Sequence, residues 1–193
     1  MSLPLLLAST SPQRRAILAQ LGIPFEVVEP CYEEHDPPGL SPVHAVREHA
    51  EGKARSVGAA EGRTVLGVDT VVVVDGIAHG KPADRSAAHT TLTLLSGRGH
   101  EVVSGLCLLG PGFAAVEHAV TSVWFRPLPP AELELYLDTG EWEGRAGAYA
   151  IQGRGAALVE RIEGDYLNVV GLPAALLVRL LARDLPGSYG FGE

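Results

Sequence analysis

The stretch Leu5-Leu-Leu-Ala-Ser-Thr-Ser-Pro-Gln-Arg-Arg15 passes from an apolar run to small hydroxyl residues and then to basic ones. The apolar part is typical of a buried strand. Ser11 followed by Pro12 is a favourable helix start, with serine as N-cap and proline as first helical residue. A strand that turns directly into a helix is typical of an α/β fold, and the free N–H groups at the helix start favour an anion. We therefore expect a phosphate or carboxylate site at the end of the first strand.

Two arginines follow this helix start, and the helical period separates them. Arg14 shares a face with Ile17, Leu18 and Leu21, which is predicted to turn toward the core. Arg15 points about 100° away from that face. A charged side chain on an inward face at a helix N-terminus is expected to meet a ligand. We therefore expect Arg14 to face the anion and Arg15 to be solvated.

The rest of the chain alternates strand-like and helix-like segments, which indicates an α/β fold. Strands are expected at 24–29, 64–74, 100–109, 113–125 and 156–162. Helices are expected at 42–57 and 84–95, from Pro129 or Pro130 to about Leu137, and after Pro173. The segment 64–74 is apolar almost throughout and predicts a central strand covered on both faces. Because no linker or repeat interrupts the pattern, we expect one domain of two lobes over 1–185 and a mobile tail at 186–193.

The composition limits the possible classes of protein. The chain has 193 residues, enough for one sizeable core, and a formal net charge of −8. That charge argues against a nucleic-acid-binding surface, which needs clustered basic residues, but not against a small anionic ligand. No apolar run approaches the roughly 18 residues that span a bilayer, and Cys31 and Cys107 match no metal or disulfide pattern. We expect a soluble, cytoplasmic protein that binds neither nucleic acid nor membranes.

Asp69 is an acid in the middle of the apolar segment 64–74. A carboxylate in such a strand must be paired, bound to a metal or exposed in a cleft. The alternative is that the strand ends at Val68 and Asp69 caps a turn, but the valines that follow resume the strand pattern at once. Pleating places Asp69 and Thr70 on opposite faces, so a bulge or strand break is expected if both line one site.

Two lysines are candidate phosphate ligands, although each has an ordinary alternative. Lys81 lies between Gly80 and Pro82, but the spacing and the proline do not match a P-loop, and such a lysine is usually solvated. Lys53 flanks the apolar face of the second helix, where it either snorkels to solvent or faces a pocket.

The remaining candidates are acids and one amide. Glu33 and Glu34 lie in an acidic loop, which is usually surface decoration, but carboxylates approaching Asp69 would form an oxygen-rich site for Mg²⁺ or Mn²⁺. Gln152, in the glycine-bounded segment 147–153, either packs in a turn or reads a base edge with its amide. Cations, acids and an anion-ready helix start together point to phosphoryl or nucleotidyl hydrolysis.

Several short motifs, in order, resemble those of the Maf family of nucleoside triphosphate pyrophosphatases, over residues 4–182. They are Leu7-Ala-Ser-Thr-Ser-Pro12, Glu33-Glu34, Lys53-Ala-Arg55, Gly67-Val-Asp-Thr-Val71, Gly80-Lys-Pro82, Leu95-Ser-Gly97, Ala146-Gly-Ala-Tyr-Ala-Ile-Gln-Gly153 and Val170-Gly-Leu-Pro173. The resemblance implies an enzyme that splits a nucleoside triphosphate into the monophosphate and pyrophosphate with a divalent cation. It also implies a homodimer whose elongated mixed sheet is flanked by helices, with a cleft between two lobes.

The resemblance also implies roles for individual residues. Asp69 matches the general base that activates water, and Glu33 with Asp69 would bind the metal. The implied substrate-binding residues are Ser9, Ser11, Arg14, Glu33, Lys53 and Lys81. Because this set is intact, catalysis is favoured over the alternative, a nucleotide-binding regulator of septum formation with little activity.

Substrate selection is implied at Gln13, Thr70 and Gln152. The Ile-Gln-Gly form of the late motif is similar to the branch of the family that acts on dTTP and UTP, since an amide can pair with a uracil-type edge. Gln13 departs from the family pattern Ser-x-Ser-Pro-Arg-Arg, where an arginine stands at this position. We expect activity to survive this substitution and nucleobase preference or affinity to shift.

Overall fold

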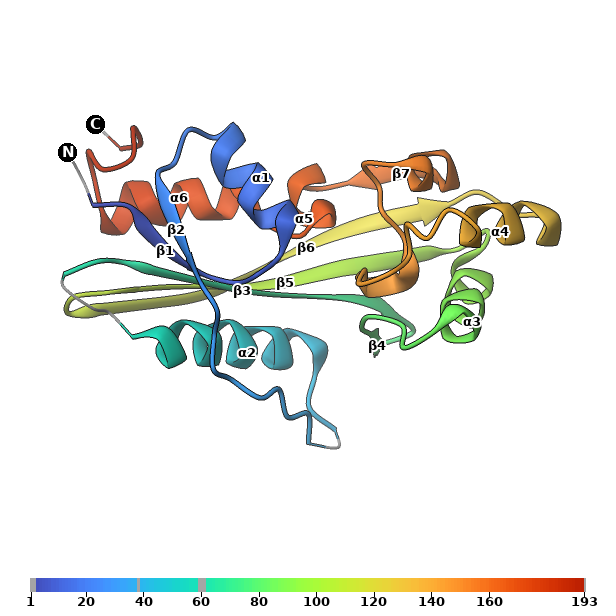
Figure 1. The fold of residues 1–193 in the computed structure, drawn as a ribbon, viewed down its shortest axis with the longest axis horizontal. Helices are drawn as coiled ribbons and strands as arrows, with labels where there is room; N and C mark the ends of the chain where they lie inside the picture. Colours follow the sequence, from blue (N-terminus) through green and yellow to red (C-terminus); the bar gives the residue numbers. More distant parts are fainter. Residues whose placement is uncertain (1–2, 38, 59–61, 193) are drawn as a thin grey trace.

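The computed structural model describes residues 3–37, 39–58 and 62–192, and these form an elongated α/β structure around one mixed sheet (Figure 1). The strand order is β2-β1-β3-β5-β6-β7, with β4 paired to β3. β1 is parallel to β2 and β3, and the other pairs are antiparallel. The strands are β1 (Leu5–Ala8), β2 (Phe25–Val28), β3 (Val65–Val74), β4 (Ile77–His79), β5 (Gly99–Gly110), β6 (Phe113–Phe125) and β7 (Val159–Glu163).

Helices cover both faces of the sheet. In Figure 1, α2 lies along one face and α1, α5 and α6 lie on the other, with α6 extending toward the chain termini. Helices α3 and α4 lie at the opposite end of the molecule. The helices are α1 (Pro12–Gln20), α2 (Pro42–Val57), α3 (Arg85–Leu95), α4 (Pro130–Leu137), α5 (Tyr166–Val170) and α6 (Ala174–Asp184), with the 3-10 turns η1 (Ala146–Ala148) and η2 (Arg154–Leu158). Within the described ranges, no helix combines the length and apolar character needed to cross a membrane.

Most predicted elements are confirmed, and the helix starts show why. Ser11, Ser41 and Asp84 each accept a hydrogen bond from the backbone N–H three residues later, as N-caps do. Two differences remain. The segment predicted as a strand at 156–162 begins with η2 and becomes a strand only at β7, and the short helix α5 was not predicted.

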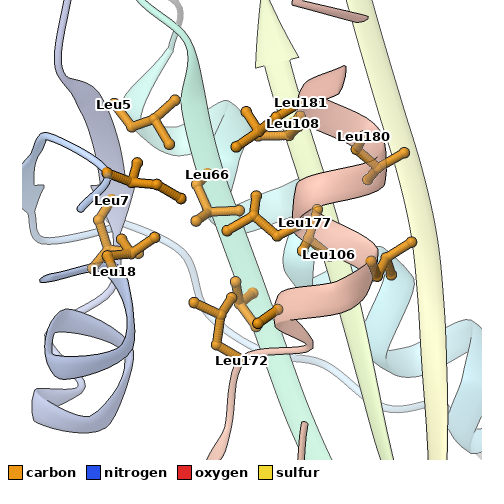
Figure 2. Close-up of a cluster of buried hydrophobic side chains, with 14 of the residues drawn as sticks. Leu5, Leu7, Leu18, Leu66, Leu106, Leu108, Leu172, Leu177, Leu180 and Leu181 are labelled. Atoms are coloured by element: carbon orange, nitrogen blue, oxygen red, sulfur yellow. The ribbon is translucent and has the colours of Figure 1, made fainter. Parts of the chain in front are cut away.

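A cluster of buried apolar side chains holds the N-terminal part of the sheet together. Figure 2 shows leucines from β1, α1, β3, β5 and α6 meeting on one face of the sheet. Leu66 of β3 points into this cluster, whereas Val65 packs in the cluster under α2, as the strand pleat requires. The C-terminal segment also makes contacts here. Tyr189 and Phe191 pack against the cluster, and the Tyr189 hydroxyl donates to the carbonyl of Leu3 at 2.8 Å.

Helix α2 lies unusually close to β3 and β5 because two glycines face it. A Cβ added at Gly67 would lie 2.1 Å from the carbonyl oxygen of Ala50, and one at Gly105 would lie 2.0 Å from that of Val46. At both positions there is room only for the hydrogen atom of a glycine. The glycines therefore allow the backbone of α2 to rest on the sheet, and Gly105 is the strand partner of Asp69.

A buried histidine on β5 makes stability depend on pH. His100 is packed edge-on against Phe125, bonds the Tyr149 hydroxyl through Nε2 at 2.9 Å, and has an unpartnered buried Nδ1. Burial lowers the pKa of His100 from 6.5 to about 4. The unfolded chain therefore binds more protons between about pH 4 and 6.5, and the free energy of unfolding falls as the pH drops through this window.

We predict a loss of up to about 3 kcal/mol from this one residue. Urea unfolding of the wild type and of His100→Phe should be compared at several pH values. As the pH falls from 6.5 to 4, the free energy of unfolding of the wild type should decrease relative to that of His100→Phe. A difference that stays constant over this window would show that His100 does not titrate in this way.

Candidate active site

A cleft of about 690 Å³ lies where the sheet leaves an edge of β3 open. β1 pairs with β3 as far as Gly67, and β4 pairs with it from Val72 onward. Between them, no strand of the described chain covers residues 68–71 on that side. One wall of the cleft is residues 8–14 with Glu34 and Lys53, and the other includes Lys81 and parts of 141–153. The predicted cleft is therefore present, at the end of the first strand.

The β1–α1 turn builds the first wall, and Arg14 is fixed in it. Its Nη1 donates to Ser9 Oγ at 3.0 Å, its Nε to the Gly171 carbonyl at 2.9 Å, and its Nη2 to Thr70 Oγ1 at 3.3 Å. Burial lowers the pKa of Arg14, and the nearby charges of Asp69 and Glu34 oppose that shift. Arg15 is exposed. The predicted separation of the two arginines is confirmed.

Asp69 and Thr70 point to opposite faces of β3. The pairing of β3 with β5 runs without interruption from Val65 to Val73, so the bulge considered from the sequence is absent from this stretch. The Thr70 hydroxyl bonds Ser104 Oγ at 2.9 Å beside Arg14, whereas Asp69 turns toward α2. Thr70 lines the cleft directly, whereas Asp69 is connected to it through Lys53.

Lys53 of α2 joins two carboxylates. Its Nζ lies 2.6 Å from Asp69 Oδ1 and 2.6 Å from Glu34 Oε1, and its side chain is 13% exposed. Lys53 therefore faces the cleft rather than extending into solvent, and it lies in front of the buried Asp69. The close approach of α2 over Gly67 and Gly105 makes this contact possible.

The structure places Glu34, and not Glu33, at the cleft. In the loop that carries them, the alternate residues Tyr32, Glu34 and Asp36 contact side chains of α2. The Tyr32 hydroxyl bonds His49 Nδ1 at 3.1 Å, and Asp36 Oδ1 bonds His49 Nε2 at 2.9 Å. Glu34, between them, contacts Lys53 and lines the cleft although its side chain is 52% exposed. Glu33 is exposed and does not line the cleft. The prediction that Glu33 lies in the pocket is wrong, because Glu34 lines the cleft in its place.

Glu34 and Asp69 are the residues here that could hold a divalent cation. In the parts of the chain described, no group of three histidine, cysteine or acidic side chains is arranged to bind a metal. The two carboxylates do converge on one cation, the Lys53 ammonium. Mg²⁺ is commonly held by one or two carboxylates together with substrate phosphates, so this pair fits such an ion.

The second wall is a turn-rich segment anchored by side chains and by the Lys81 loop. Glu141 accepts hydrogen bonds from the backbone N–H of Arg154 at 2.9 Å and of Gly155 at 3.2 Å. Gly147 donates its N–H to the carbonyl of Gly80 at 3.2 Å, which places this segment beside Lys81. Sequence reasoning missed three cleft residues, Glu141, Arg145 and Gly171, and it considered Glu34 only as one of an acidic pair with Glu33.

The predicted site residues are thus largely brought together. Those that line the cleft are Ser9, Ser11, Gln13, Arg14, Lys53, Thr70, Lys81 and Gln152. Asp69 contacts the cleft through Lys53. The arrangement presents cations and hydrogen-bond donors around one buried acid, which suits a phosphorylated substrate.

Comparison with known proteins places the chain in a family. The model of the Maf-like protein family matches residues 4–184. The chain belongs to this family. The Maf-like chain is 48% identical to the dTTP/UTP pyrophosphatase of Symbiobacterium thermophilum, over 93% of each protein. It is also 48% identical to the protein of that name in Nitratidesulfovibrio vulgaris, over 93% of this chain and 87% of the relative.

Among solved structures, the Maf-like chain is similar to a HAM1 protein from Coxiella burnetii. The TM-score is 0.48 at 15% sequence identity, and the similarity covers 81% of this chain and 91% of that one.

Proposed function

We propose that the chain is a nucleoside triphosphate pyrophosphatase that hydrolyses dTTP and UTP to the monophosphate and pyrophosphate. The relatives named dTTP/UTP pyrophosphatase match it over nearly its whole length. The observation that carries the proposal is the Asp69–Lys53–Glu34 arrangement beside Arg14, at an open sheet edge in a cleft. This arrangement places a candidate general base, Asp69, beside the basic side chains that can bind phosphate.

In the proposed reaction, water attacks the α-phosphate and pyrophosphate leaves. Lys53 holds Asp69 through Oδ1, and no protein group in the described chain bonds Oδ2, so Oδ2 is the atom that takes the proton of the water. Arg14, Lys81 and the N–H groups at the start of α1 bind phosphate oxygens and stabilise the charge that develops in the transition state.

A divalent cation, Mg²⁺ or Mn²⁺, is part of the proposal, and Glu34 and Asp69 would hold it. When bound it would neutralise triphosphate charge. The support is the convergence of these carboxylates on a single ammonium at the cleft.

A homodimer and a cytoplasmic location complete the proposal. Cys31 and Cys107 are free, which agrees with a reducing compartment. Light scattering on the purified protein tests the dimer, since it reports mass directly.

The nucleotide panel is the experiment that tests the proposed function. Pyrophosphate release should be measured with dTTP, UTP, CTP, ATP and GTP in the presence of Mg²⁺ or Mn²⁺. We expect dTTP and UTP to give the highest kcat/KM. Nucleotide binding without release from any of them would favour the alternative, a nucleotide-binding regulator.

Gln13 is the position at which we expect this chain to differ from relatives with the arginine pattern. Its Oε1 accepts a hydrogen bond from Ser11 Oγ at 3.1 Å on the first wall of the cleft. Gln13→Arg adds a cation there, so we expect the ratio of kcat/KM between UTP and dTTP or CTP to change about tenfold, with activity retained. Arg15→Gln, on the exposed side of the same helix, is the matched control. Equal ratios in the wild type and Gln13→Arg would remove Gln13 from substrate selection.

A further inference from the structure

Arg145 is a cation of the second wall to which the preceding mechanism gives no role. It immediately precedes η1 and lines the cleft. The turn that follows it is fixed in place, because Gly147 has φ +70° and a Cβ there would lie 2.5 Å from Val72 Cγ2. The N–H of Gly147 is also held by the Gly80 carbonyl. Arg145 and Lys81 therefore lie on loops that are tied together.

The basic side chains that line the cleft, Arg14, Lys53, Lys81 and Arg145, differ in their bonding partners. Lys53 is bonded by two carboxylates, and Arg14 donates to three neutral oxygens. Across the described residues, the side chains of Lys81 and Arg145 form no hydrogen bond or ion pair, and Arg145 Nε is buried without a partner. Burying a charged donor in this way is unfavourable unless a ligand completes its hydrogen bonds.

The acids near Arg145 do not take up its charge. Glu141 and Glu143 also line the cleft. The two carboxylate oxygens of Glu141 accept the backbone N–H groups of Arg154 and Gly155. Glu143 is exposed and forms no ion pair with Arg145. Arg145 thus keeps a planar set of donors available on the cleft wall opposite Arg14. Such a set matches the oxygens of a phosphate group in a bidentate manner.

We propose that Arg145, with Lys81, binds the β- and γ-phosphates of the substrate, the part that leaves as pyrophosphate. This inference rests on the proposed function. The α-phosphate belongs near Asp69, whose neighbouring cation Lys53 already carries two acidic partners. The two terminal phosphates carry most of the triphosphate charge, and they match the two cations without a partner.

Calorimetric binding tests this assignment independently of turnover. The ligands are α,β-imido-UTP, which keeps all three phosphates but resists cleavage, and UMP, which lacks the terminal two. For Arg145→Ala we expect the Kd of α,β-imido-UTP to rise about 10- to 100-fold and that of UMP to change less than about twofold. Arg145→Lys keeps the charge without the planar fork, so it should recover part of the affinity.

Arg154→Ala is the matched control, because Arg154 is an exposed arginine of the same segment that does not line the cleft. Its affinities should equal those of the wild type. Unchanged α,β-imido-UTP binding by Arg145→Ala, or an equal loss for UMP, would overturn the assignment. The proposed function is tested separately, by turnover. It would be wrong if the wild type released no pyrophosphate, even if it bound α,β-imido-UTP more tightly than Arg145→Ala does.

Discussion

Asp69→Asn is expected to lower kcat for UTP about a thousandfold while the Kd for the nucleotide changes little. The asparagine has the same shape, and its carbonyl can still accept the hydrogen bond that Lys53 donates at 2.6 Å. It cannot take a proton from water. Steady-state pyrophosphate release gives kcat, and calorimetry with α,β-imido-UTP gives the Kd.

Asp75→Asn is the matched control for this substitution. Asp75 makes the turn after β3 and pairs with Arg98 at 2.8 Å, and its side chain is 68% exposed. It should keep wild-type kcat. If Asp69→Asn retained more than about a tenth of the wild-type rate, Asp69 would not be the general base.

Gly105→Ala is expected to reduce the free energy of unfolding by about 3 kcal/mol. The added methyl group would lie 2.0 Å from the carbonyl oxygen of Val46, so α2 must move away from β5. That movement would also draw Lys53 away from Asp69, and we expect kcat to fall together with stability. Urea unfolding at neutral pH measures the first effect.

Gly80→Ala is the control, since a Cβ there meets no atom within 4 Å. Its unfolding free energy should change by less than about 1 kcal/mol. A Gly105→Ala protein as stable as the wild type would show that α2 does not need this close approach.

Local signals predicted much of the fold and one wall of the site. The helix beginning after Ser11 and the separation of Arg14 from Arg15 depend on capping and helical period, which act over a few residues. The opposite directions of Asp69 and Thr70 likewise follow from strand pleating. The open edge beside these residues depends on where β1 and β4 stop, which is set by pairings between strands that are distant in the sequence.

The choice between Glu33 and Glu34 shows why the rest could not be predicted. Both acids have the same chemistry, and the loop has no period that the sequence reveals. Its register is set by Tyr32 and Asp36 bonding His49 of α2, contacts between segments that are 13 to 17 residues apart. Arg145 was missed for a similar reason, since only the folded structure shows that its Nε is buried without a partner.

The central claim is that this cleft directs water to the α-phosphate, and hydrolysis of UTP in ¹⁸O-labelled water tests it most directly. Mass spectrometry of the products locates the oxygen that came from the solvent. We expect the label in UMP and unlabelled pyrophosphate. Label in the pyrophosphate, or release of inorganic phosphate in place of pyrophosphate, would contradict it.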